Sequence, residues 1–275
     1  MAASSEPSAT FALARCESGR QSVGAKLGGK LSRLLARSVV TKRLAMRNAK
    51  PVVSFTFDDA PASACDAGAR LLEQYQARGT YYISGGGCGA LSPGGKLASA
   101  AQVQALHAKG HEIGCHTYGH VAVSEVGDDS LTAELERNRC FLQGVDRGIV
   151  VRNFAYPFGD LSFRAKRRLE ASFDSCRSLR PGVNVAVADL GALRSCQLQN
   201  SSIDRQGVLD IVAETVRRNG WLVFTSHDVA SRPSRFGASP DLLAFALQAA
   251  RAGGCHIVPV RQALRIVGGW RAAAP

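Results

Sequence analysis

The chain has 275 residues, 45% of them hydrophobic, and a formal charge of +12, so it is long and apolar enough for a full hydrophobic core. It has no apolar run of about 18 residues and no N-terminal apolar run of a secretory signal, so we expect neither a membrane span nor export, and the expected compartment is the cytoplasm. The eight cysteines stand singly, which argues against a thiolate zinc site and favours reduced thiols.

Basic charge is concentrated in a leader, residues 1–50. It holds ten Lys or Arg and two Glu, a net charge of +8, so residues 51–275 supply only the remaining +4. Residues 1–22 are small, polar and without period, which predicts disorder. Nucleic acid is not an expected partner, because the positive charge is confined to the leader and no aromatic residues alternate with it.

The second half of the leader, residues 23–47, is typical of a cationic amphipathic helix. Apolar residues recur at roughly helical spacing and basic residues stand between them: Leu27, Leu31, Leu34, Leu35 and Val39, with Lys26, Lys30, Arg33 and Arg37. Such a helix could contact an anionic membrane surface peripherally, or it could pack on the rest of the protein or remain mobile. A transit peptide is a third alternative.

From Pro51 onward, short apolar segments alternate with helical ones. The expected strands are residues 52–57, 79–84, 111–116, 152–158, 173–178, 192–198, 221–226 and 256–260, and the expected helices are residues 63–78, 99–109, 130–143, 162–172, 204–219, 240–252 and 261–267. This alternation predicts an α/β fold with a mostly parallel sheet, open or closed into a barrel, because parallel strands need crossover connections. In either form, functional residues collect at the C-terminal ends of the strands.

The first strand ends in two carboxylates, Asp58 and Asp59, and Pro61 stops the run. Adjacent residues in extended backbone point in opposite directions, so one carboxylate could bind an ion while the other faces a bound water as general base. Alternatively, one of them caps the helix that begins near Ser63.

The third strand leads into HEIGCHTYGH, residues 111–120. His111 and His116 are five residues apart, about 140° on a helix, so the helical metalloprotease pattern fails. His116 and His120 are four apart, about 40°, and could reach one ion, although structural histidines are the alternative. His111 and Glu112 are expected to begin the strand, and Cys115 is expected to be a buried thiol.

The seventh expected strand, residues 221–226, is followed by His227 and Asp228, so three of the strands end in groups that should converge. One carboxylate and two neutral imidazoles on a divalent ion would leave the site positive, which acidifies a bound water and polarises a carbonyl. The set suits hydrolysis of an amide or an ester. The glycines of residues 84–89 fit no nucleotide-binding pattern and predict a rim loop.

The segments TFDD, HTYGH, FAYPFG and WLVFTSHDV, in this order, resemble the polysaccharide deacetylase family, also called the NodB-homology domain or carbohydrate esterase family 4. The resemblance covers about residues 51–265. It implies a distorted (β/α) barrel of about seven or eight mostly parallel strands, a single catalytic domain over residues 51–270. It also implies removal of N-acetyl, or sometimes O-acetyl, groups from sugars with a divalent metal, zinc above all.

By position, the resemblance implies that Asp59, His116 and His120 bind the metal. Asp58 would then be the general base and His227 the acid that protonates the leaving amine. An Asp/His/His set also accepts cobalt, nickel or iron.

Other positions of the same motifs are implied to contact the substrate. The oxyanion would be held by the backbone N–H of Phe158, since Pro157 has none, with Tyr156 beside it. Trp221 and Leu222, which precede the catalytic histidine, would line the acetyl pocket.

Two departures from the family pattern concern the partners of the base and the acid. Many members have an Arg where this chain has Ala155, and that Arg pairs with the base. Arg177 or Arg180 could take its place, with Arg180 also a candidate substrate contact, although both could be surface residues. The Asp that orients the acid histidine has no clear match, and Asp189 is the candidate.

The leading hypothesis is a metal-dependent sugar deacetylase acting on an intracellular or lipid-linked glycan precursor. One alternative uses the same site on a linear or cyclic amide that is not a sugar. Another, from a different class, is an inactive carbohydrate-binding module. The presence of both Asp58 and His227 argues against it, because a binding site needs neither base nor acid.

Overall fold

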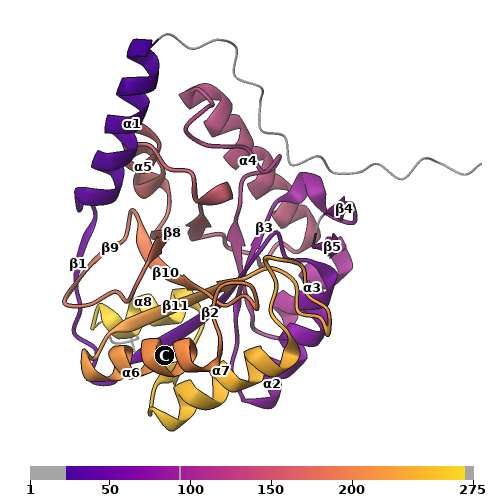
Figure 1. The fold of residues 1–275 in the computed structure, drawn as a ribbon. Helices are drawn as coiled ribbons and strands as arrows, with labels where there is room; N and C mark the ends of the chain where they lie inside the picture. The colour runs from indigo at the N-terminus through magenta and orange to yellow at the C-terminus, as the bar shows by residue number, and fades with distance from the viewer. Residues whose placement is uncertain (1–22, 93, 270–275) are drawn as a thin grey trace, which may run out of the picture.

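The fold is a closed barrel of parallel strands surrounded by helices (Figure 1). The computed structural model describes residues 23–92 and 94–269. Round the barrel the order is β2 (Val52–Asp58), β3 (Thr80–Ile83), β6 (Glu112–Cys115), β7 (Asn153–Ala155), β8 (Ser175–Pro181), β10 (Leu193–Gln197) and β11 (Trp221–Ser226). The ring closes because β11 pairs in parallel with β2 over its whole length. The expected (β/α) barrel is therefore confirmed.

An eighth parallel strand, β12 (His256–Ile257), lies outside the ring. The segment of β12 donates backbone hydrogen bonds to the carbonyls of Pro51 and Val53 on one edge of β2. On the opposite edge, which faces β11, the N–H of Val52 donates to the carbonyl of Gly220. Higher along β2, the edge that β12 leaves free is taken by β3. One edge of β2 thus serves two short strands, which is why the barrel has seven members although eight strands were predicted.

The sequence of β2 explains its central place. All seven of its residues are buried, as expected for a parallel strand covered on both faces. Phe55 stacks on Phe224 of β11, with 5.3 Å between ring centroids. This packing fixes β2 and β11 at the point of closure and holds the ends of both strands in one place.

Helices follow the strands where the sequence predicted them. They are a π-helical turn (Ala64–Gly68) that continues as α2 (Ala69–Gln74), then α3 (Ala100–Ala108), α4 (Asp128–Val145), α5 (Phe163–Ser172), α6 (Arg205–Arg217), α7 (Pro240–Ala252) and α8 (Val260–Val267). At the start of α3, Ser99 and Gln102 form a reciprocal capping box. Two loop segments, β4 (Leu91–Ser92) and β5 (Gly95–Lys96), pair as an antiparallel hairpin that the sequence did not predict.

The second half of the leader packs on the barrel. The predicted amphipathic helix is present as α1 (Val23–Ser38) and contacts α5. After it, β1 (Arg43–Ala45) pairs antiparallel with β9 (Val187–Asp189), and Lys42 donates hydrogen bonds to the carbonyls of Glu170 and Phe173. The predicted disorder of residues 1–22 lies outside the described residues.

Two further findings concern the described helices and cysteines. None of the described helices has the length and hydropathy needed to cross a membrane. The seven cysteines among the described residues are all free thiols, as their scattered positions predicted.

Candidate active site

The C-terminal end of β2 presents the two carboxylates in different directions. Asp58 is the last strand residue and bonds to Arg177, whereas Asp59 leaves the strand with φ of 57° and faces His116 and His120. The separation expected from alternating strand geometry is therefore present, with the left-handed turn at Asp59 adding to it.

Asp59, His116 and His120 form a compact group of metal-ligand type. Oδ1 of Asp59 lies 3.8 Å from Nε2 of His116 and 3.3 Å from Nε2 of His120. One ligand atom from each of the three residues lies within 4.8 Å of the others, and this is the one such group within residues 23–92 and 94–269. Cys115, beside His116, hydrogen-bonds to Asn138 instead.

A backbone contact fixes the orientation of His116. Its Nδ1 lies 2.8 Å from the carbonyl oxygen of Ala155, which can only accept a hydrogen bond, so Nδ1 carries the proton. Nε2 is then the lone-pair nitrogen, and it is the one that faces Asp59. Such a contact is how proteins set the tautomer of a metal-binding histidine.

The electrostatics of the group also suit a cation. Burial lowers the pKa of His116 and of His120 to about 4, so both imidazoles are neutral at neutral pH, the form that binds a metal. Burial raises the pKa of Asp59, against the opposing attraction of His116 and His227. A divalent ion would reverse that penalty, because it stabilises the ionised carboxylate.

Asp58 is held by a buried guanidinium. Nη2 of Arg177 lies 2.5 Å from both carboxylate oxygens of Asp58, and Arg177 is fully buried. Burial alone would raise the pKa of Asp58, but the charge of Arg177, helped by His116 and His227, holds that pKa below its usual value. Asp58 is therefore ionised at neutral pH.

Backbone strain is concentrated at the same place. Among the described residues, eight non-glycine positions have positive φ, and five of them lie in the segments that follow β2, β6 and β7: Asp59, Ala60, Thr117, His120 and Phe158. Left-handed conformations of such residues persist only where the surroundings enforce them, and they cluster at functional sites. The strain turns Asp59 and His120 toward each other and brings the Phe158 ring to 4.4 Å from that of His120.

These groups open into a large cavity of about 750 Å³. His227, which follows β11, lines the same cavity as the Asp/His/His group, is half-buried, and has its ring centroid 5.3 Å from that of Phe236. The described residues offer no hydrogen-bond partner to its Nδ1. The candidate base, the candidate acid and the metal-type ligands thus share one cavity at the C-terminal ends of the strands, where (β/α) barrels carry their chemistry.

Comparison with known protein families gives a match over part of the chain. The polysaccharide deacetylase family model matches residues 45–172. Over these residues the chain resembles the polysaccharide deacetylase family. Members of that family hydrolyse carbon–nitrogen bonds other than peptide bonds. No curated protein sequence matches the chain.

Solved structures of similar fold support the barrel of the deacetylase family. A peptidoglycan N-acetylglucosamine deacetylase is 16% identical, with a TM-score of 0.57, covering 80% of this chain and 90% of its own. A protein from Mycobacterium smegmatis described as a polysaccharide deacetylase is 17% identical, with a TM-score of 0.57, covering 84% and 99%. A family 4 carbohydrate esterase from Bacillus subtilis is 12% identical, with a TM-score of 0.54, covering 85% and 88%.

Two residues expected to line an acetyl pocket lie away from the cavity. Trp221 and Leu222 are the first residues of β11, paired with Val52 and Val53 at the far end of the barrel from the cavity. Nε1 of Trp221 donates to the Ser54 hydroxyl at 3.0 Å, and both side chains are fully buried. Their placement in the pocket was wrong, because only the last residues of a strand reach the mouth.

Tyr156 and Arg180 also lie outside the residues that line the cavity. Tyr156 is buried, and its hydroxyl donates to the carbonyl of Gly191 at 2.9 Å. Arg180 is half-buried, and its pKa is lowered by burial and by the neighbouring Arg194. The expectation that Tyr156 and Arg180 contact the substrate is therefore not supported by their positions, because neither side chain lines the cavity. Phe158, from the same motif as Tyr156, does line the cavity.

Asp189 does not orient His227. It is buried on β9, where its carboxylate accepts a hydrogen bond from Lys166 at 2.6 Å. Asp228, the next residue after His227, is committed to Ser234. Both carboxylates therefore stabilise loops and strands around the site.

The sequence patterns missed part of the cavity wall. Its further lining residues come from the ends of β8 and β10, from the β4–β5 hairpin and from the loop after β11: Leu179, Gln197, Gln199, Ser92, Gly94, Ser234, Arg235 and Phe236. Gln197 could have been found from its place at the end of a predicted strand. The loop residues carried no such signal, since their position depends on how the loop folds back over the barrel.

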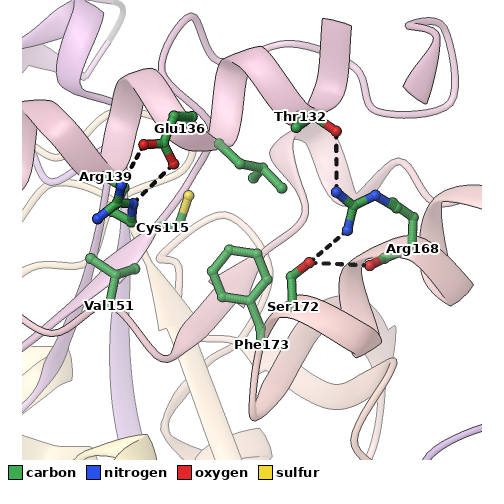
Figure 2. A pocket seen from close by; sticks show the side chains of 9 residues that line it. Cys115, Thr132, Glu136, Arg139, Val151, Arg168, Ser172 and Phe173 are labelled. Carbon is green, nitrogen blue, oxygen red and sulfur yellow. Dashed lines mark hydrogen bonds and ion pairs between the residues drawn. The ribbon is translucent and has the colours of Figure 1, made fainter. Parts of the chain in front are cut away.

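A second, smaller cavity of about 220 Å³ lies between α4 and α5 (Figure 2). Its two basic groups are already engaged: Arg139 pairs with Glu136, and Arg168 bonds to Thr132 and Ser172. Its floor is apolar, with Phe173 and Val151 beside the buried Cys115. This cavity contains none of the deacetylase motif residues.

Proposed function

We propose that this chain is a metal-dependent hydrolase that removes N-acetyl groups, or O-acetyl groups, from a carbohydrate. The observation that carries the proposal is the group of Asp59, His116 and His120 within one cavity that also holds Asp58 and His227. One carboxylate and two imidazoles suit zinc, and they also accept cobalt, nickel or iron. The ion would supply Lewis-acid polarisation and make water more acidic.

The residues that line the cavity have separate tasks in this mechanism. Asp58, kept ionised by Arg177, accepts a proton from the attacking water. His227 donates a proton to the leaving amine. The backbone N–H of Phe158 stabilises the charge that develops on the carbonyl oxygen. Leu179 and Phe236 offer apolar surface to the acetyl group, and Gln197 and Gln199 offer amides to sugar hydroxyls.

The proposed substrate is an intracellular or lipid-linked glycan precursor. The size of the cavity, about 750 Å³, suits an oligosaccharide segment. The basic second half of the leader, packed beside the barrel, suits a substrate carried at a negatively charged surface.

The test is acetate release from a panel of N-acetylglucosamine oligomers and O-acetylated sugars, followed by mass spectrometry of the products. We expect release that chelation abolishes and added zinc restores. The Asp59→Ala variant should be inactive, while the matched His256→Ala variant, which changes an exposed histidine at the other end of the barrel, should be fully active. Activity that survives chelation and Asp59→Ala would refute the metal mechanism, and binding without acetate release would favour a carbohydrate-binding module.

A further inference from the structure

The outer face of α1 is an exposed apolar stripe. Leu31, Leu34 and Leu35 are 57%, 60% and 38% exposed, and at about 100° per residue they lie within an arc of about 100°. Val39 and Val40, just after the helix, are also exposed. Five of the ten exposed large hydrophobic side chains in the described part of the chain thus fall within ten consecutive residues. Contiguous exposed apolar surface of this kind marks an interaction site.

Positive charge lies beside this stripe. Lys30, Arg33 and Arg37 occupy the neighbouring face of α1 and are exposed. Residues 29–50 contain seven Lys or Arg and no Asp or Glu. Among the side chains that the structure describes, this basic face forms one ion pair, between Arg33 and Asp160, and it is long at 3.8 Å. The charges are therefore available to an anionic partner.

The third face of α1 is fixed to the barrel. The hydroxyl of Ser32 accepts a hydrogen bond of 3.0 Å from the backbone N–H of Phe163, at the start of α5. Ala36 is fully buried, and Nζ of Lys166 donates to its carbonyl at 3.0 Å. Figure 1 shows α1 beside α5 at the edge of the molecule. The helix is thus held in place with its apolar stripe outward.

We propose that α1 is a docking surface for an anionic lipid bilayer, with Leu31, Leu34 and Leu35 at the boundary of headgroups and acyl chains. Charge complementarity selects this occupant. A second copy of the chain would bring two groups of uncompensated basic residues face to face, whereas an anionic leaflet attracts them. An apolar stripe beside a basic face is the pattern of helices that lie in the membrane interface.

Docking through α1 would place the catalytic cavity beside the lipid headgroups. Phe158 and Gly159 line the cavity, and the next residue, Asp160, contacts Arg33. Phe163, four residues after Gly159, contacts Ser32. The wall of the cavity and the docking helix are therefore one short segment apart. This consequence for the substrate rests on the proposed function, but the docking itself does not.

The test is flotation of the full chain with vesicles of phosphatidylcholine alone and of phosphatidylcholine mixed with phosphatidylglycerol. We expect binding to the anionic vesicles only, weakening as salt is added. The double variant Leu31→Gln, Leu34→Gln should weaken vesicle binding at least about tenfold. The double variant Lys30→Gln, Arg37→Gln should weaken vesicle binding about fivefold for each charge removed. Leu209→Gln with Val216→Gln, on the exposed face of α6, is the matched apolar control, and Arg217→Gln with Arg251→Gln the matched basic control.

Three results would overturn the proposal. The first is that the chain binds neither kind of vesicle. The second is that vesicle binding falls equally in the α1 variants and in their controls. The third is that the chain forms a dimer in solution which the leucine variant dissociates, while the chain does not bind vesicles. Equal thermal midpoints of all variants show that folding is not the cause of a loss. The Asp59→Asn variant should float like the unaltered chain, so failure of the catalytic proposal and failure of docking give different results.

Discussion

The guanidinium of Arg177, on β8, bonds both carboxylate oxygens of Asp58, from the strand position that pairs directly with Ala155 of β7. The resemblance to the deacetylases places an arginine at position 155. Here the neighbouring strand supplies the guanidinium from the paired position, and both residues are buried. The candidate base Asp58 therefore has an arginine partner, which comes from the neighbouring strand.

Replacing Arg177 should impair the base. In Arg177→Met, burial of Asp58 would no longer be opposed by the guanidinium, so the pKa of Asp58 should rise. The acid limb of the kcat/KM profile should then move to higher pH, and the rate at neutral pH should fall by about 100-fold. Arg177→Lys, which keeps the charge, should shift the limb less.

The strand pairing offers a stricter control. Ala155→Arg in the background of Arg177→Ala returns a guanidinium to the position that the family pattern favours. We expect the acid limb to move back toward that of the unaltered chain. A pH profile identical in all four proteins would show that Arg177 does not act through Asp58.

Removing either histidine of the metal-type group should abolish metal binding. His116→Ala and His120→Ala each delete an Nε2 that faces Asp59, so zinc affinity measured by isothermal titration should fall at least about 100-fold. His256→Ala, in an exposed histidine, should keep full affinity. His227→Ala should bind the metal normally but lose activity, since His227 is expected to handle the proton and not the ion.

Much of this site could be predicted because barrel geometry makes strand ends converge. Short segments of five to seven residues predicted the strands, and the titratable residues at or soon after the strand ends predicted the site: Asp58, Asp59, His116, His120 and His227. The same rule could have excluded Trp221 and Leu222, which begin their strand.

What the sequence left open depended on register and long-range packing. Arg177 and Arg180 are three positions apart on β8, so their side chains point to opposite faces, but only the register shows which one points to Asp58. The pairing of β1 with β9 joins two segments of only three residues each that lie far apart in the sequence. Such strands carry no hydrophobic period to predict them.

The stability of the metal-free protein should fall as pH is lowered from about 6.5 to about 4. His116 and His120 have a pKa of about 4 in the folded state, against an ordinary value of 6.5 when unfolded. Between these values the unfolded chain binds more protons, so falling pH favours unfolding, by an amount on the order of 2 kcal/mol per histidine. Denaturant unfolding across this range should show the slope, and His120→Asn should reduce it; an unchanged slope would contradict the assignment.

The far end of the barrel should affect stability and leave catalysis unchanged. Trp221→Phe removes the hydrogen bond to Ser54 and leaves a small cavity where the indole was fully buried, so the free energy of unfolding should fall by about 2 kcal/mol. KM and kcat should not change, because Trp221 lies at the start of β11, at the opposite end of the strand from the cavity. Phe236→Ala, in a half-buried residue of the cavity wall, should do the reverse and raise KM with little loss of stability. A raised KM in Trp221→Phe at unchanged stability would return Trp221 to the substrate pocket.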